Sequence, residues 1–161
     1  MLRFLVLFCV LFVGIQGQST QVSACTSNIG SLPLNAYIEG CITPPCNLPQ
    51  LEDVVMHIVF RAPRTMRTMR TLATAYLSGG IITLPVPYDL GENAITCNFL
   101  NNSYCPVLEG EVLQYTLKMR VESFMPVGTA APIEFRVVGE TNSDAVFCIR
   151  VPIVVTAPLN A

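Results

Sequence analysis

The sequence has 161 residues and a formal net charge of −2, with 52% hydrophobic and only 12% charged residues. A nucleic-acid partner is not expected, because that function needs a concentrated basic face, and eleven acidic residues here outnumber nine basic ones. A chain of this length and apolar content can build one domain with a substantial buried core.

The first 17 residues are typical of a secretory signal peptide. Arg3 supplies a positive charge, an apolar run follows from Phe4 to Ile15, and a small residue stands at Gly17. The run is shorter than the ~20 residues that span a bilayer. We therefore predict cleavage after Gly17 and a secreted mature domain of residues 18–161, with delivery to a lysosome as an alternative.

Alternation of apolar and polar residues recurs along the chain and predicts short strands with one buried face each. In chain order the predicted strands cover 34–38, 54–60, 72–77, 81–86, 114–122, 133–137 and 147–155. Turn signals occur at 79–80, 85–87, 91–93 and 139–142. About seven such strands predict an all-β sandwich of two sheets.

Six cysteines follow the predicted cleavage site, and an even number in a secreted chain indicates three disulfides. Cys41 and Cys46 lie five positions apart around two prolines, and Cys97 and Cys105 bracket a polar loop. Local pairing of these two couples leaves Cys25 to join Cys148. That bond would tie together the two ends of the domain.

The sequence shows none of the patterns that indicate an enzyme. His57 is the only histidine and no C-x-x-C pair occurs, so no metal site is expected. His57 stands between Met56 and Ile58 in a predicted strand and is interpreted as a partly exposed strand residue. No G-x-S-x-G elbow or glycine-rich phosphate loop is present. We expect a non-enzymatic protein without a cofactor.

Two further motifs have an ordinary and a functional interpretation. The sequon Asn101-Asn102-Ser103 lies in a loop bracketed by two cysteines, which makes Asn101 a candidate glycosylation site. Residues 64–72 form an arginine-threonine triplet repeat, a period that fits neither a strand nor a helix. The ordinary interpretation of the repeat is an exposed connection, and contact with anionic lipid or a membrane is the alternative.

The cysteine order and its surroundings resemble the ML lipid-recognition family, especially arthropod members of its Niemann–Pick type C2 group. The segments with this resemblance are CITPPCNL at 41–48, LPVPY at 84–88 and VFCIRVP at 146–152. The resemblance covers essentially the whole mature chain. It implies an immunoglobulin-like β-sandwich with a hydrophobic pocket between the sheets. It also implies the same three disulfides.

Family members bind sterols, fatty acids or other hydrophobic ligands, so the resemblance implies a carrier for lipid transport or chemical signals. We expect this carrier to be a monomer. A lipid-dependent innate-immune recognition module, with a receptor contact, is the alternative. The pocket positions that the resemblance assigns are Ile38, Val54, Tyr88, Tyr115, Val121, Met125, Pro126 and Phe135. We add Phe124, which neighbours them, and Met56, which would let the wall rearrange together with Met119.

The absence of tryptophan bears on the identity of the ligand, and the energetic cost of an empty cavity bears on the size of the pocket before ligand binds. Sterol-carrying vertebrate members have tryptophan at the positions of Phe135 and Ile149, and this chain has no tryptophan, which favours a ligand other than cholesterol. An enclosed empty cavity of about 300 Å³ would cost roughly 7 kcal/mol. We therefore expect a small or partly collapsed pocket that opens as ligand enters, with the ligand head group at a mouth formed by 124–126.

Overall fold

The structure, a computed structural model, describes residues 17–141 and 145–159 of the chain. The predicted signal peptide lies outside these residues except for Gly17, so it stays a prediction. None of the helices in the described ranges has the length and hydrophobicity needed to cross a membrane.

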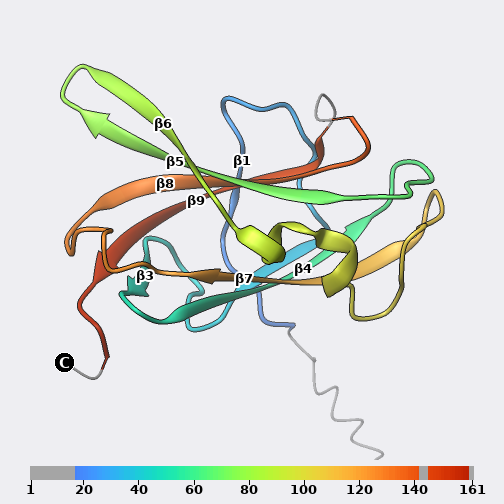
Figure 1. Cartoon of the computed structure of the whole chain (residues 1–161), viewed down its shortest axis with the longest axis horizontal. Coiled ribbons are helices and arrows are strands. Elements are labelled where there is room, and N and C mark those ends of the chain that lie inside the picture. Colours follow the sequence, from blue (N-terminus) through green and yellow to red (C-terminus); the bar gives the residue numbers. More distant parts are fainter. Residues whose placement is uncertain (1–16, 142–144, 160–161) are drawn as a thin grey trace, which may run out of the picture.

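The larger of two sheets forms one layer of the molecule (Figure 1). Its strand order is β1 (Ser23–Ala24), β9 (Ala145–Thr156), β8 (Ala130–Val138), β5 (Arg70–Gly79) and β6 (Ile82–Tyr88). The short strand β3 (Cys46–Pro49) also pairs with β9, in parallel, beyond the point where β1 pairs with it. β9 can accept both partners on one edge because it is 12 residues long.

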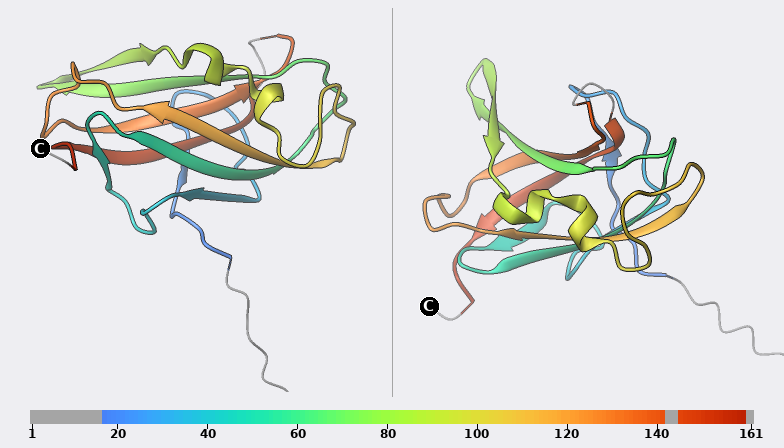
Figure 2. Two further views of the ribbon diagram at one scale, coloured as in Figure 1. Left: turned by 60° about the horizontal axis from the view of Figure 1, so that its bottom comes forward. Right: turned by 45° about the vertical axis from the view of Figure 1, so that its right-hand side comes forward.

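The smaller sheet forms the second layer and has the order β2 (Asn35–Ile38), β4 (Asp53–Arg61), β7 (Val112–Arg120). Every second side chain of β7 is buried between the layers, as the alternation in the sequence predicts. Two short 3₁₀ helices, η1 (Gly91–Ala94) and η2 (Thr96–Phe99), contact both β5 and β7 at the side of the sandwich (Figure 2).

The predicted two-sheet, all-β architecture is confirmed, and each of the seven predicted strands is present. The turn predicted at 85–87 is wrong, because these residues lie inside β6. Proline fits there since β6 is an edge strand, and Pro85 and Pro87 both lack an N–H on the same side of the strand. β1 and β3 were not predicted, because strands of two and four residues are too short to show alternation.

Residues 64–69 of the triplet repeat connect β4 to β5, residues 70–72 begin β5, and two methionines of the repeat are buried in the core. Met66 and Met69 are buried, whereas Arg67 and Arg70 are exposed. The ordinary interpretation, an exposed connection, therefore describes the arginines but not the methionines. The repeat lies at the opposite end of the sandwich from the β5–β6 hairpin (Figure 1). Its contact with anionic lipid stays a prediction.

The three predicted disulfides are confirmed. Cys41–Cys46 and Cys97–Cys105 close short loops, and Cys25–Cys148 joins residues 123 positions apart. We call Cys25–Cys148 the end-to-end disulfide. A cross-link over so long a loop restricts the unfolded chain and stabilises the fold by up to roughly 4–5 kcal/mol in the chain-entropy account.

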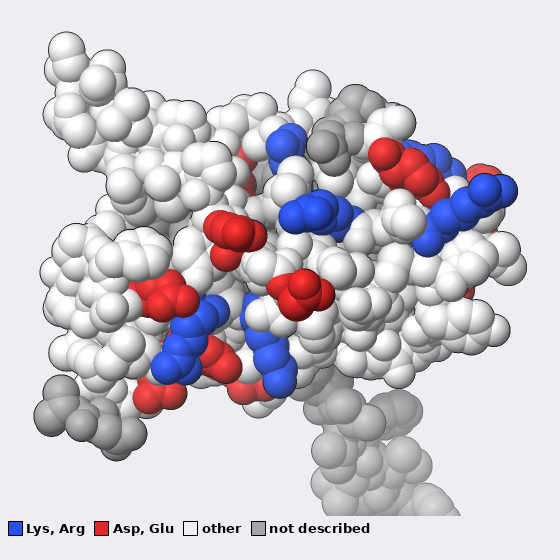
Figure 3. Space-filling view, in the orientation of Figure 1, with Lys and Arg blue, Asp and Glu red and all other residues white. Residues whose placement is uncertain are grey.

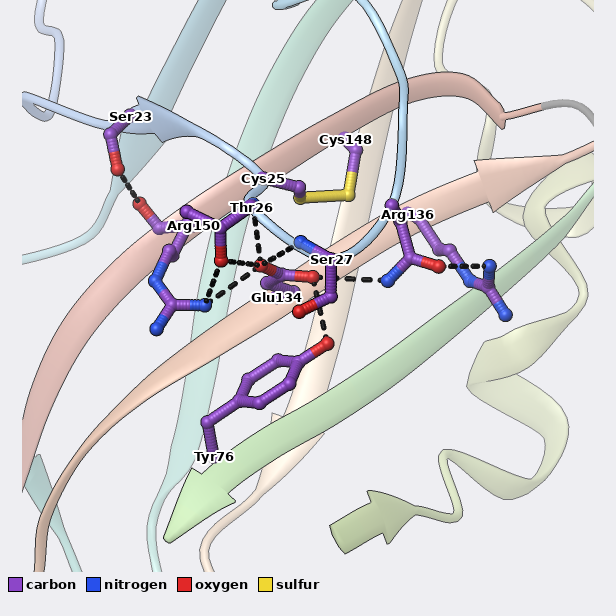
Figure 4. Close-up of a disulfide and its surroundings, with 10 residues drawn as sticks. Ser23, Cys25, Thr26, Ser27, Tyr76, Glu134, Arg136, Cys148 and Arg150 are labelled. Carbon is purple, nitrogen blue, oxygen red and sulfur yellow. Dashed lines mark hydrogen bonds and ion pairs between the residues drawn. A yellow bond between two sulfur atoms is a disulfide. The ribbon is translucent and has the colours of Figure 1, made fainter. Parts of the chain in front are cut away.

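Glu134 fastens the N-terminal segment to the outer face of the larger sheet, beside the end-to-end disulfide (Figure 4). Its buried Oε1 accepts a hydrogen bond from the Thr26 amide at 2.9 Å and pairs with Arg150 Nη1 at 2.8 Å. Its Oε2 accepts hydrogen bonds from Asn28 Nδ2 and from the Tyr76 hydroxyl, both at 3.0 Å. The carboxylate thus joins the N-terminal segment to strands β5, β8 and β9.

These hydrogen bonds lower the pKa of the Glu134 carboxyl group. Burial by itself raises the pKa of a carboxyl group, but the four donors outweigh it and lower the pKa of Glu134 from 4.5 to about 2. A group whose pKa is lower in the folded state stabilises the fold at pH values above its unfolded pKa. The contribution of Glu134 is therefore complete above pH 4.5 and is lost as the pH falls toward 2.

We predict that Glu134→Gln lowers the free energy of unfolding at pH 7 by about 3 kcal/mol, which corresponds to the lowered pKa. Urea unfolding at pH 7, 4 and 2.5 should show the difference from wild type shrinking with acid. Glu39→Gln is the matched control. Glu39 pairs with His57 at 2.7 Å but is half exposed, so its loss should cost no more than about 1 kcal/mol. A Glu134→Gln effect that is independent of pH would contradict this account.

Candidate functional site

An apolar cavity of about 510 Å³ opens at one end of the sandwich. One wall is the β5–β6 hairpin, the other is the end of β7 with the loop that follows it, and strands β8 and β9 form the floor. Figure 3 shows a notch between the hairpin and the body of the molecule, with uncharged surface on both sides. The lining residues are Ala75, Leu77, Val86, Pro87, Tyr88, Asp89, Met119, Glu122, Phe124, Met125, Pro126, Thr129, Ala131, Ile133, Ile153 and Val155.

The cavity exists because the hairpin leaves the larger sheet early. Pairing between β5 and β8 ends at Ala75 opposite Ile133, whereas β5 pairs with β6 as far as Gly79. The next residue of β8, Pro132, has no N–H to donate to β5. The outer half of the hairpin therefore extends beyond the sheet, and its inner face, with Leu77 and Val86, borders open space.

The cavity is larger than the small or partly collapsed pocket that we expected from the cost of empty space. That cost applies to an enclosed void, whose lining atoms lose their contacts without any compensation. This cavity opens to solvent between exposed residues, of which Phe124 is 73% exposed, so water can occupy it. The enclosed part of the space between the sheets is filled by side chains instead.

Exposed apolar side chains lie along the two chain segments that form the walls of the cavity. At the hairpin tip Ile81 is fully exposed, and its neighbours Ile82 and Leu84 are also exposed. Phe124 and Val127 are exposed on the opposite wall. Residues 71–88 contain no charged residue. We call these five residues the apolar rim, and surfaces of this kind mark sites of binding.

The predicted pocket residues fall into two groups in the structure. Tyr88, Phe124, Met125 and Pro126 line the cavity. The other predicted residues are packed in the core outside the lining: Ile38, Val54, Met56, Tyr115, Val121 and Phe135. Val54 is half-buried and the other five are buried. Contact between these six residues and a ligand stays a prediction.

Apart from Tyr88, sequence reasoning missed the lining residues that come from the hairpin and the floor. Ala75, Leu77 and Val86 lie in two weakly patterned strands, and Ile133 and Ile153 alternate as ordinary core residues do. The uncharged run 71–88 was the available signal, because a long uncharged hairpin at the edge of a sheet indicates a surface that is covered or occupied.

Tyr115 lies within the filled core. Its hydroxyl is buried and lies 2.7 Å from Thr71 Oγ1, which lies 2.8 Å from Thr96 Oγ1. Burial raises the pKa of Tyr115 to about 12, although hydrogen bonds with the two threonines lower it in part. The three hydroxyls satisfy one another in an apolar environment and join β5, β7 and η2.

We predict that Tyr115→Phe lowers the free energy of unfolding by about 1 kcal/mol, because the substitution removes one buried hydrogen bond with little change in volume. Tyr104→Phe serves as the control, since the Tyr104 side chain is 80% exposed. Chemical denaturation should show a change within about 0.5 kcal/mol for that variant. Equal effects of the two substitutions would be inconsistent with a structural role for the buried hydroxyl.

The remaining candidate residues lie away from the cavity, on the outer face of the smaller sheet. His57 is 44% exposed, as predicted, and its Nε2 lies 2.7 Å from Glu39, a partner that sequence reasoning missed. Asn101 is exposed, and its Nδ2 donates a hydrogen bond to Thr116 Oγ1 at 2.8 Å. Glycosylation of Asn101 stays a prediction.

Cys25, Glu134 and Cys148 bring potential metal ligands close together, but both sulfurs belong to the end-to-end disulfide. The cluster therefore offers no thiolate to a metal ion. Its carboxylate is already occupied by the hydrogen bonds of the N-terminal segment.

Together these features define a class of protein: a disulfide-bonded β-sandwich with an apolar cavity that opens between its two layers at one end. A family model described as the ML domain matches residues 19–155. The chain therefore belongs to the ML-domain family, as the resemblance predicted, and its fold is an immunoglobulin-like β-sandwich.

Solved structures agree on the fold. A Niemann–Pick type C2 protein from Japanese carpenter ant superposes with a TM-score of 0.67 at 17% identity, covering 84% of this chain and 99% of that protein. Chicken MD-1 complexed with lipid IVa matches with a TM-score of 0.43 at 13% identity, covering 71% of this chain and 75% of that one. The second match is too distant to support an argument. The comparison with curated proteins gave no significant match.

Proposed function

We propose that this chain binds a small hydrophobic molecule, such as a sterol, a fatty acid or another lipid, in the cavity and carries it through an aqueous compartment. The proposal rests on one observation, an apolar cavity of about 510 Å³ that opens through the apolar rim. Pockets for small molecules have volumes of roughly 300–1,000 Å³ and mainly apolar walls. Membership of the ML-domain family supports the proposal.

Burial of apolar surface would supply the affinity. A ligand that buries about 300 Å² of apolar surface gains about 7.5 kcal/mol at roughly 25 cal/mol per Å². The cost of immobilising the ligand reduces this gain, so we expect dissociation constants in the micromolar range or weaker for single-chain ligands. Larger ligands would bind more tightly because they contact more of the floor.

We propose that Tyr88, Phe124, Met125 and Pro126 contact the ligand at the mouth, and that Met119 adapts the inner wall to its shape. Methionine suits this position because its thioether chain is flexible and polarisable. The packed residues Ile38, Val54, Met56, Tyr115, Val121 and Phe135 would meet the ligand only if it displaced the core behind the floor. We keep these residues as a second, deeper part of the proposed site.

Secretion, glycosylation at Asn101 and a binding role without catalysis belong to the same proposal. Three disulfides persist in oxidising compartments, which supports an extracellular or lysosomal location. The described lining of the cavity contains no histidine, cysteine or serine, the residues most often used as bases and nucleophiles.

A lipid-dependent recognition module is the second candidate, and the apolar rim favours it because a partner could cover the rim together with a bound lipid. The two candidates differ in what happens to the ligand. A carrier should release a fluorescent sterol to acceptor phosphatidylcholine vesicles without a further protein, whereas a recognition module should retain it.

We predict that Ala75→Phe weakens uptake of a fluorescent sterol or fatty acid at least fivefold, because Ala75 lines the cavity and a phenyl ring would occupy part of it. Ser78→Phe is the matched control, since Ser78 is exposed, lies on the same strand and is not part of the lining. Fluorescence titration should give wild-type affinity for the control and a stoichiometry near one. Equal uptake by Ala75→Phe and Ser78→Phe would exclude this cavity as the binding site.

A further inference from the structure

The charged side chains in the cavity lining are all acidic. Asp89 directly follows β6 and Glu122 follows β7, so the two carboxylates come from opposite walls of the mouth. The described lining contains no lysine, arginine or histidine. Asp89 is exposed and Glu122 is half-buried.

The nearest basic side chains lie outside the cavity. Lys118 and Arg120 border a neighbouring depression of about 240 Å³ that runs along the free edge of β7 and includes the same two carboxylates. Arg120 pairs with Asp53 at 3.2 Å, so its charge is offset locally. Asp89, Glu122 and Lys118, which has no ion pair among the described residues, together leave a net negative charge around the mouth.

Two of the hydrogen-bond donors beside the mouth, those of Tyr88 and Gln50, are already used. The Tyr88 hydroxyl donates to the Arg120 carbonyl at 2.8 Å. The Gln50 side-chain amide donates to the carbonyl groups of Ser123 and Met125. A carboxylate, in contrast, accepts several hydrogen bonds and donates none. Asp89 Oδ1 accepts one from the Gly91 amide at 2.9 Å, which leaves it further capacity.

The raised pKa of the Tyr88 hydroxyl is consistent with a negative electrostatic potential at the mouth of the cavity. Burial raises the pKa of its hydroxyl, and the charges of Glu122, Asp89 and Asp53 raise it further. A field that opposes a negative charge on the Tyr88 oxygen also opposes an anionic ligand group beside it.

We propose that Asp89 and Glu122 select lipids whose head group donates a hydrogen bond, an alcohol or an ammonium, and disfavour lipids with an anionic head group. This inference rests on the proposed function, because it presumes that the cavity binds a lipid. Each carboxylate at roughly 6 Å from the head group in a water-like medium weakens the binding of an anion about threefold. The two together should discriminate by about tenfold.

A matched ligand series on one hydrocarbon chain tests the inference. Tetradecan-1-ol, tetradecylamine and tetradecyl sulfate, each kept below its solubility limit or micelle concentration, compete with the neutral fluorophore N-phenyl-1-naphthylamine at pH 7.4. The sulfate replaces a fatty acid because it stays charged at this pH. For wild type we expect the alcohol to bind about tenfold more tightly than the sulfate, and the amine to bind more tightly still because the same two carboxylates attract an ammonium.

The double substitution Asp89→Asn with Glu122→Gln should reduce the ratio of alcohol to sulfate affinity to below about threefold. Glu92→Gln is the control, because Glu92 is an exposed acidic residue of η1 outside the lining, and it should keep the tenfold ratio. Circular dichroism checks that all variants are folded.

Each outcome has one meaning. A ratio near one in wild type, or an unchanged ratio in the double variant, would overturn the head-group inference while the lipid-binding proposal stands. Failure of the fluorophore and all three ligands to bind wild type would overturn the proposed function and this inference with it.

Discussion

The early end of pairing between β5 and β8 keeps the two layers of the molecule apart at one end. Beyond Ala75, strand β5 pairs only with β6 among the described strands. Pro132 of β8 has no backbone N–H to donate to β5. The hairpin therefore forms one wall of the cavity instead of a continuous part of the sheet. The position of the cavity, its apolar walls and its open mouth all follow from this arrangement.

The rest of the structure stabilises a fold in which part of the interior is left open. The filled end of the sandwich buries the inner faces of both sheets, and the hydroxyls of Tyr115, Thr71 and Thr96 satisfy one another within it. On the outer face, Glu134 and the end-to-end disulfide hold the N-terminal segment against the larger sheet. Stabilising contacts and the proposed binding site thus lie in different parts of one small domain.

The sequence pattern predicted the strands and the local disulfides well, because alternation of apolar residues and cysteine spacing are local properties of a sequence. The strand at 114–122 and the local bonds Cys41–Cys46 and Cys97–Cys105 depend on nearby residues. The turn assigned to 85–87 was wrong because proline is read as a turn signal, although an edge strand also accepts it.

The candidate site was harder to predict, for a physical reason. An apolar residue that faces inward has the same pattern whether side chains or open space lie beyond it, so Tyr115 in the core and Ile133 in the lining could not be distinguished. Which of them borders the cavity depends on where β8 stops pairing with β5, a long-range property. At the mouth, Met125 and Pro126 were predicted through the family resemblance, and Phe124 was predicted as their neighbour.

A crystal structure of the protein grown with tetradecan-1-ol tests the central claim most directly. This account predicts one elongated molecule between the β5–β6 hairpin and residues 122–126, with its hydroxyl group toward Asp89 or Glu122. Electron density for ordered water alone in that space, or the alcohol bound at another surface, would contradict it.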